Sequence, residues 1–274
     1  MKKVVFLFAT LFTVYAAIAQ NTATTTQTGD NNEATITQLG NLNNSVILSN
    51  GNNNKSTALM YGNENVTNVE QQGNGNSSDV RIGFQTNKTY PSNKNEVVIL
   101  QIGNNNDVRS GLTWGDENKD EIEQRGNANY FEIGVKYGNL NEITETTVGN
   151  ENRTRFSLPA NWGSFSDGNK LTITKVGNKN YVSGKMQGDL NTVTIDQVGD
   201  LNKVGTSWYT VDGVSIEGSS NTVGILQNGM ANQSLNSIVG NQNAIDITQY
   251  GIGNLCTTSI VGNLNAISVV QDNH

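Results

Sequence analysis

The stretch NTVTIDQVGDLN, residues 191–202, decides the fold of this chain. Positions 191, 193, 195 and 197 hold Asn, Val, Ile and Gln, and the positions between them hold Thr, Thr and Asp. Alternation with period two and β-branched residues predicts a strand that buries one face. Gly199 and Asn202 follow it, and both residue types tolerate a positive φ. The stretch therefore predicts a strand followed by a tight turn.

The Gly-x-x-Asn motif recurs along almost the whole chain. Its asparagine occurs 21 times from Asn21 to Asn265, and fifteen of the twenty steps are 11 residues long, two are 12 and three are 17 to 19. Glycine stands three residues before each asparagine from Asn32 onward, except at Ser92 and Ser166. The segments between turns hold about seven residues, an ordinary strand length. A period this regular is typical of repeat architectures.

The full repeat is 22 residues, because the sixth residue after each asparagine alternates in character. Counted from Asn21 as zero, even segments carry mostly Gln there and odd segments mostly apolar residues. We therefore predict an all-β, two-sheet β-solenoid of about ten 22-residue strand-turn-strand rungs, about 50 Å long. The five long steps all begin in odd segments. One sheet should be regular and the other bulged.

The interior should be stabilised by ladders of amides, since large apolar side chains are sparse. A buried amide is costly alone, but in a stack each one donates to one neighbour and accepts from the other. The predicted ladder comprises Gln27, Gln71, Gln101, Gln124, Gln197, Gln227, Gln249, Gln271, Asn32, Asn43, Asn191, Asn221, Asn243 and Asn265.

Residues 1–19 have the pattern of a secretory signal peptide. Lys2 and Lys3 precede the apolar run 4–18, which is too short to span a bilayer, and Ala17-Ile18-Ala19 fits a cleavage site. We therefore expect a signal peptide at 1–19, a single solenoid domain at 20–274 and no transmembrane segment. The mature chain keeps 15 basic residues against 24 acidic ones, a net charge of about −9. Such a charge gives no reason to expect a nucleic-acid partner.

The residue types needed for catalysis are scarce, so we predict no enzyme and no catalytic, cofactor or metal site. The single histidine is His274, and Cys256 falls at an inward position without a histidine base nearby. No Cys/His cluster suggests zinc. Glu145 occupies an inward position and Lys175 a glutamine position. Two interpretations stay open for them: a local ion pair, or a register slip that takes both to water.

Aromatic residues in the irregular odd segments are candidates for partner binding, because their rings can stack on sugars or on another protein. The alternative is that they fold back over the odd sheet. The residues concerned are Trp162, Phe165, Trp208 and Tyr209.

The pattern Asn-x-Val-x-Ile-x-Gln-x-Gly-x-x-Asn of residues 191–202 resembles the curlin repeat of curli fibre subunits, and the resemblance covers nearly the whole mature chain. Curli repeats carry Gln on both strands, whereas the odd strands here are mostly apolar. The resemblance implies export through an outer-membrane secretion channel of a Gram-negative bacterium. It also implies polymerisation, with itself or with other curli-type subunits, into a secreted, extracellular or cell-surface functional amyloid that serves biofilm matrix and adhesion.

Three functions are compatible with these observations. The leading one is a structural subunit that polymerises head-to-tail through uncapped terminal rungs, whose strand edges are open for pairing. The second is an accessory or nucleating subunit that decorates such fibres. The third is a monomeric secreted solenoid that binds a ligand.

Overall fold

The computed structural model describes residues 20–83, 92–159, 166–206 and 212–273. The predicted signal peptide and four candidate partner-binding residues, Trp162, Phe165, Trp208 and Tyr209, lie outside the described residues.

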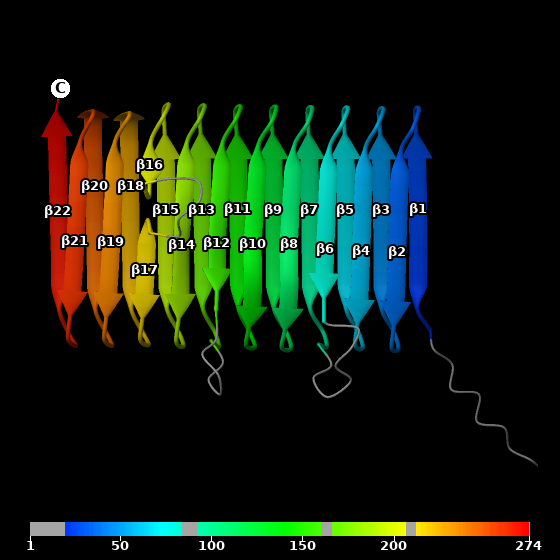
Figure 1. Ribbon diagram of the computed structural model, residues 1–274, viewed down its shortest axis with the longest axis horizontal. Helices are drawn as coiled ribbons and strands as arrows, with labels where there is room; N and C mark the ends of the chain where they lie inside the picture. The colour runs from blue at the N-terminus through cyan, green and yellow to red at the C-terminus, as the bar shows by residue number, and fades with distance from the viewer. Residues whose placement is uncertain (1–19, 84–91, 160–165, 207–211, 274) are drawn as a thin grey trace, which may run out of the picture.

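The described chain is a rod made of two parallel sheets, between which successive strands alternate (Figure 1). The first sheet contains β1 (Thr22–Thr28), β3 (Asn44–Asn50), β5 (Val66–Gln72), β7 (Glu96–Ile102), β9 (Lys119–Arg125), β11 (Glu142–Val148), β13 (Lys170–Val176), β15 (Thr192–Val198), β18 (Thr222–Met230), β20 (Ala244–Ile252) and β22 (Ala266–Asn273). The second contains β2 (Glu33–Leu39), β4 (Lys55–Tyr61), β6 (Ser77–Ile82), β8 (Asp107–Trp114), β10 (Tyr130–Tyr137), β12 (Arg153–Leu158), β14 (Tyr181–Gln187), β16 (Lys203–Val204), β17 (Val214–Glu217), β19 (Gln233–Val239) and β21 (Leu255–Val261).

Each strand pairs in parallel with the equivalent strand one rung later, which confirms the predicted β-solenoid of about ten rungs. The register is set by the repeat: Thr22 pairs with Asn44, and Thr192 with Thr222 across a longer step. The irregular segments all fall in the second sheet, as expected. One of them divides a strand into β16 and β17, so 22 strands are described where the repeat count predicts 21.

The turns use positive φ at two positions, and one differs from the sequence prediction. Gly29, at the first turn position, has φ 101°, as expected for glycine. The second left-handed residue is the one before the motif asparagine, such as Asn31 with φ 56° or Leu201 with φ 61°. The motif asparagine itself is not left-handed and directly precedes the next strand. Its role lies in its side chain.

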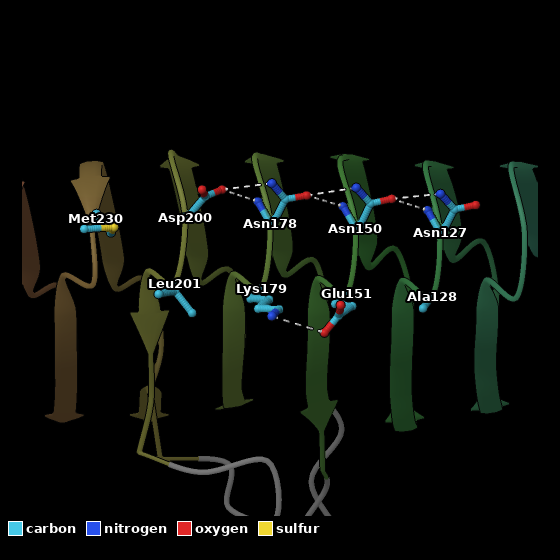
Figure 2. A pocket seen from close by; sticks show the side chains of 9 residues that line it. All are labelled: Asn127, Ala128, Asn150, Glu151, Asn178, Lys179, Asp200, Leu201 and Met230. Atoms are coloured by element: carbon cyan, nitrogen blue, oxygen red, sulfur yellow. Dashed lines mark hydrogen bonds and ion pairs between the residues drawn. The ribbon is translucent and has the colours of Figure 1, made fainter.

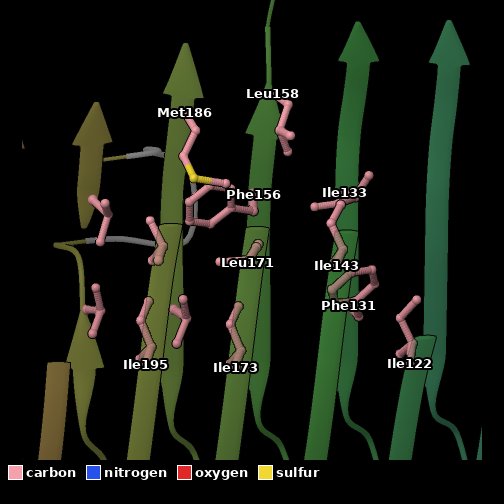
Figure 3. Packing of buried hydrophobic residues seen from close by; sticks show 14 of the residues in the cluster. Ile122, Phe131, Ile133, Ile143, Phe156, Leu158, Leu171, Ile173, Met186 and Ile195 are labelled. Carbon is pink, nitrogen blue, oxygen red and sulfur yellow. The ribbon is translucent and has the colours of Figure 1, made fainter. Parts of the chain in front are cut away.

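The core is a narrow column of Val, Ile and Leu side chains between the sheets (Figure 3). The ring of Phe156 fits because the neighbouring rung makes room for it. Phe156 is 1% exposed and lies against Gly184 of β14, where an added Cβ would come 2.3 Å from the ring. Met186 packs beside the same ring. The interior therefore matches residue volume from one rung to the next, as close-packed protein cores do.

Bulges in β8 and β10 shift the inward positions by one residue. Sequence counting places Leu112 and Val135 at the sixth position after their asparagines, and their side chains lie outside the description. The following residues, Thr113 and Lys136, are buried, and Lys136 pairs in register with Leu158 of β12. The extra residue of each 12-residue step is thus absorbed as a β-bulge before the strand ends.

Candidate assembly site: side-chain ladders and end rungs

The motif asparagines form two continuous ladders along the rod, one at each edge of the sheets. In a typical step the backbone N–H of Asn54 donates to Oδ1 of Asn32 at 3.0 Å, and Nδ2 of Asn54 donates to the Gly73 carbonyl at 2.8 Å. Near the other end of the rod, the N–H of Asn243 likewise donates to Oδ1 of Asn221 at 2.9 Å, and its Nδ2 donates to the Gly262 carbonyl at 2.7 Å. Each asparagine therefore links three successive rungs through its backbone N–H and its side-chain amide, which explains why this position requires asparagine.

A second amide ladder runs through the second turn position in the opposite direction (Figure 2). Here the earlier residue donates to the later one: both N and Nδ2 of Asn127 donate to Oδ1 of Asn150, and those of Asn150 to Oδ1 of Asn178. Asn178 donates likewise to Asp200. Sequence analysis did not select this position, although Asn or Asp occupies it in many turns.

These turns line an open groove of about 710 Å³ that ends at Met230. Lys179 and Glu151 form an exposed ion pair at 3.8 Å along it, and Asp200 is a further acidic residue of the lining. The amides of Asn127, Asn150 and Asn178 in the groove are used by the ladder that ends at Asp200.

The glutamines of the first sheet form two ladders inside the rod. One runs from Ser49 through Gln71 and Gln101 to Gln124, with contacts of 3.0 to 3.2 Å. The other runs through Gln197, Gln227, Gln249 and Gln271, each Nε2 donating to the next Oε1 at 2.8 Å.

Each glutamine also joins the two sheets. Nε2 of Gln227, for example, donates to the Lys203 carbonyl of the opposite sheet at 3.0 Å, and Nε2 of Gln249 to the Gln233 carbonyl at the same distance. The ladder residues therefore tie neighbouring rungs together and also close each rung across the interior.

Most of the predicted ladder residues are brought together, but the first rung differs. Gln27 pairs in register with Ser49, but it is exposed and its side chain makes no hydrogen bond to another described residue. Gln38 of β2 was not selected from the sequence, yet its Nε2 donates to the Thr22 carbonyl at 2.9 Å, the same cross-sheet contact that the other glutamines make. The predicted asparagines lie in the edge ladders, buried at Asn43, Asn191, Asn221 and Asn243, half-buried at Asn32 and exposed at Asn265.

Between the two glutamine ladders, charged side chains fill the interior. Nζ of Lys175 lies 2.9 Å from Oε1 of Glu145, and neither side chain is exposed, so the ion-pair interpretation is correct and no register slip occurs. Lys175 also donates to Thr154. A second buried pair joins Lys136 to Asp120.

The Lys136–Asp120 pair was missed because the bulge in β10 conceals the inward position of Lys136. The sequence signals of this pair are the 12-residue step from Asn129 to Asn141, which indicates a bulge without placing it, and an inward Asp two residues after Asn118.

This charged zone is the least satisfied part of the described interior. Burial lowers the pKa of the Lys175 ammonium, and the Glu145 carboxylate opposes that shift. One oxygen of Asp120, one of Glu145 and Oε1 of Gln197 are buried without a hydrogen-bond partner. Charges removed from water are stabilised only when all their hydrogen bonds are made, so this zone should cost stability rather than add to it.

The rungs at the two ends of the described rod carry exposed strand edges. All seven residues of β1 are exposed, and the inward residues Ile267 and Val269 of β22 are only half-buried. No described group donates to Oδ1 of Asn254 or Asn265. The amide ladders therefore reach both ends with unused hydrogen-bonding groups.

The fold and these ladders define a repeat protein of the two-sheet parallel β-solenoid class. The model of the curlin-associated repeat matches residues 19–49 and 29–58, which confirms the resemblance to the curlin-repeat family. That family is structural rather than enzymatic, and its repeats are typical of extracellular curli fibres. No curated protein matches the chain significantly. The described residues include no helix long and apolar enough to cross a membrane.

Proposed function

We propose that this protein is a structural subunit of extracellular curli-like amyloid fibres, polymerising head-to-tail through its end rungs. The observation that carries the proposal is a difference in hydrogen bonding: the asparagine ladders are paired inside the rod and have unused groups at its ends. Inside the rod the Oδ1 of each motif asparagine accepts the backbone N–H of the next one, as in Asn221 and Asn243, whereas Oδ1 of Asn254 and of Asn265 accepts no hydrogen bond from a described group. A second copy offers the missing donors at Asn21 and Asn32.

Backbone groups favour the same contact. The outer edges of β1 and β22 present strand N–H and C=O groups that pair with a parallel strand of equal length. A heterologous contact between the two different ends repeats without closing and gives a filament. Strands of successive rungs stack about 4.8 Å apart, the spacing that is characteristic of cross-β fibres.

The signal-like segment at 1–19 and the curlin repeats together favour export through an outer-membrane channel to the cell surface. There the fibre would serve biofilm matrix and adhesion, alone or with other curli-type subunits. An accessory role, in which the protein nucleates or decorates another subunit's fibres, is distinguished by the assembly experiment.

The test uses purified residues 20–274 transferred from denaturant into buffer. Thioflavin fluorescence, electron microscopy and fibre diffraction follow the product. We expect unbranched fibres with a meridional spacing of about 4.8 Å, seeded by their own fragments. A monomer that only accelerates or decorates fibres of another curli-type subunit supports the accessory role. A stable monomer that is inert toward such fibres contradicts both.

A further inference from the structure

The two outermost described strands, β1 and β22, belong to the same sheet. Strands of the two sheets alternate along the chain, so each strand lies half a rung beyond the previous one. At one end β1 projects half a rung beyond β2, and at the other end β22 projects half a rung beyond β21. The rod therefore has a step at each end, and both steps project from the first sheet (Figure 1).

These steps decide how two copies fit. If the second copy has the same orientation as the first, its β1 docks on β22, so that the two projecting strands contact each other. The β2 strand of the second copy then lies two strand spacings from β21, about 9.6 Å. A slot one strand wide stays open in the second sheet, and the backbone groups on both sides of it are left unpaired.

We infer that successive copies are instead related by a half-turn about the rod axis, so that β1 of one copy pairs with β21 of the preceding copy and β2 pairs with β22. This inference rests on the proposed polymerisation. Strands of the two sheets run in opposite directions (Figure 1). A half-turn about the rod axis exchanges the sheets and reverses strand direction, so both new pairings stay parallel. Each projection enters the opposite recess, and no slot remains.

The side chains of the first rung fit this arrangement. In register with the pairing of β20 and β22, Gln38 falls on Gln271, which continues the glutamine ladder across the junction. At the equivalent position, the other second-sheet strands whose inward side chains are described carry Met, Ile, Leu, Thr or Lys. Among these described second-sheet strands, β2 therefore has at this position the residue type, glutamine, that is typical of the first sheet.

The turn ladders also continue. The half-turn places Asn21 over Asn254 and Asn32 over Asn265. The Oδ1 atoms of Asn254 and Asn265 can then accept hydrogen bonds from the second copy. The half-turn also places the turn 29–32 over the turn 262–265, so that the Asn263 N–H meets the Asp30 carboxylate. Repeated orientation would engage only one of the two asparagine pairs. Gln27 lies over Ile260 in the half-turn arrangement, which is its one unmatched contact.

Disulfide trapping distinguishes the two arrangements, because adjacent parallel strands hold equivalent Cα atoms at a separation that a disulfide bridges. All variants carry Cys256→Ser, which copies Ser234 of the neighbouring strand. The half-turn aligns position 26 with 259 and position 37 with 270, whereas repeated orientation aligns position 26 with 270. All four residues are exposed and point outward, so their substitution leaves the interior intact.

We expect fibres of Thr26→Cys/Ser259→Cys and of Thr37→Cys/Val270→Cys to give covalent multimers after mild oxidation, at least tenfold more than Thr26→Cys/Val270→Cys. The reverse ranking overturns the half-turn but keeps the fibre. Fibres without multimers from any pair overturn end stacking. Failure of every variant and of the unmodified chain to form fibres overturns the proposed function itself.

Native Cys256 supplies a second readout. It lies on β21, which β1 covers after a half-turn but which faces the open slot in repeated orientation. Alkylation of Cys256 should therefore slow at least tenfold when the monomer assembles. An unchanged rate contradicts the half-turn.

Discussion

Lys175 and Glu145 form an ion pair with an N–O distance of 2.9 Å inside the rod, with neither side chain exposed to solvent. Lys175 lies in register between Thr147 and Gln197, in the gap between the two glutamine ladders. The pair therefore places two desolvated charges where the ladders have neutral, hydrogen-bonded amides. A buried ion pair of this kind seldom makes a protein more stable than neutral side chains of similar size would.

Removing one member of this pair should destabilise the rod, and replacing both should restore it. Lys175→Gln alone leaves Glu145 buried and unpaired, so we expect a loss of about 3–5 kcal/mol in the free energy of unfolding. The double variant Lys175→Gln/Glu145→Val removes both charges of this pair and should equal or exceed the unmodified protein in stability. Urea denaturation of the monomer measures both.

The matched control is Lys170→Gln, which breaks the exposed pair with Glu142 at 3.2 Å. It should change stability by no more than about 1 kcal/mol. A Lys175→Gln variant as stable as this control would mean that the buried pair is solvated.

Stability should also depend on pH through Lys175. Its folded-state pKa is lowered by burial, so the unfolded chain binds more protons than the folded rod between that pKa and the ordinary value. In this window stability rises with pH. We therefore expect the unmodified protein to gain stability relative to Lys175→Met between pH 7 and 10, measured by urea denaturation at each pH. A constant difference would contradict the direction of the shift.

The glutamine ladder predicts a sharp contrast between two adjacent residues. Gln227→Ala removes contacts to Gln197, Gln249 and a cross-sheet carbonyl, and leaves buried partners unsatisfied. We expect a loss of at least about 2 kcal/mol. Asn228→Ala, on the exposed face of the same strand, should be nearly neutral. Equal effects in thermal or urea unfolding would show that the ladder adds no stability.

The turn glycines should differ in the same way from glycines within strands. Gly126 has φ 125°, and an added Cβ would lie 1.9 Å from the Gly149 carbonyl oxygen of the next rung. Gly126→Ala should therefore destabilise the rod by more than about 3 kcal/mol, since both the φ value and the contact must change. Gly224→Ala meets only the Asp246 side chain, at 3.4 Å, and should be mild. Comparable unfolding midpoints for the two variants would refute this account of the turns.

The repeat made most of the fold predictable from sequence, because a 22-residue period with alternating burial leaves one way to stack the strands. What was missed depends on departures from that period. Lys136 reaches the interior through a bulge that shifts the inward face by one residue, and counting from Asn129 cannot locate a bulge. Gln38 was passed over because its strand belongs to the mostly apolar set. The positive φ of the residue before the motif asparagine, such as Leu201, is imposed by the geometry of the turn and not by the residue type. The amino-acid type at that position therefore does not predict it.

The ladders of the motif asparagines and the ladders at the second turn position run in opposite directions, and this affects the dipole of the rod. Side-chain carbonyls at the strand starts, such as that of Asn32, point along the rod one way, and those at the second turn position, such as that of Asn150, point the other way. Aligned amides in a helix add up to a macrodipole, whereas these two sets offset each other. The asparagine ladders therefore contribute little net dipole along the rod, and its two ends differ in the atoms that these asparagines present. We expect hydrogen-bond geometry at the asparagines to select the direction of growth.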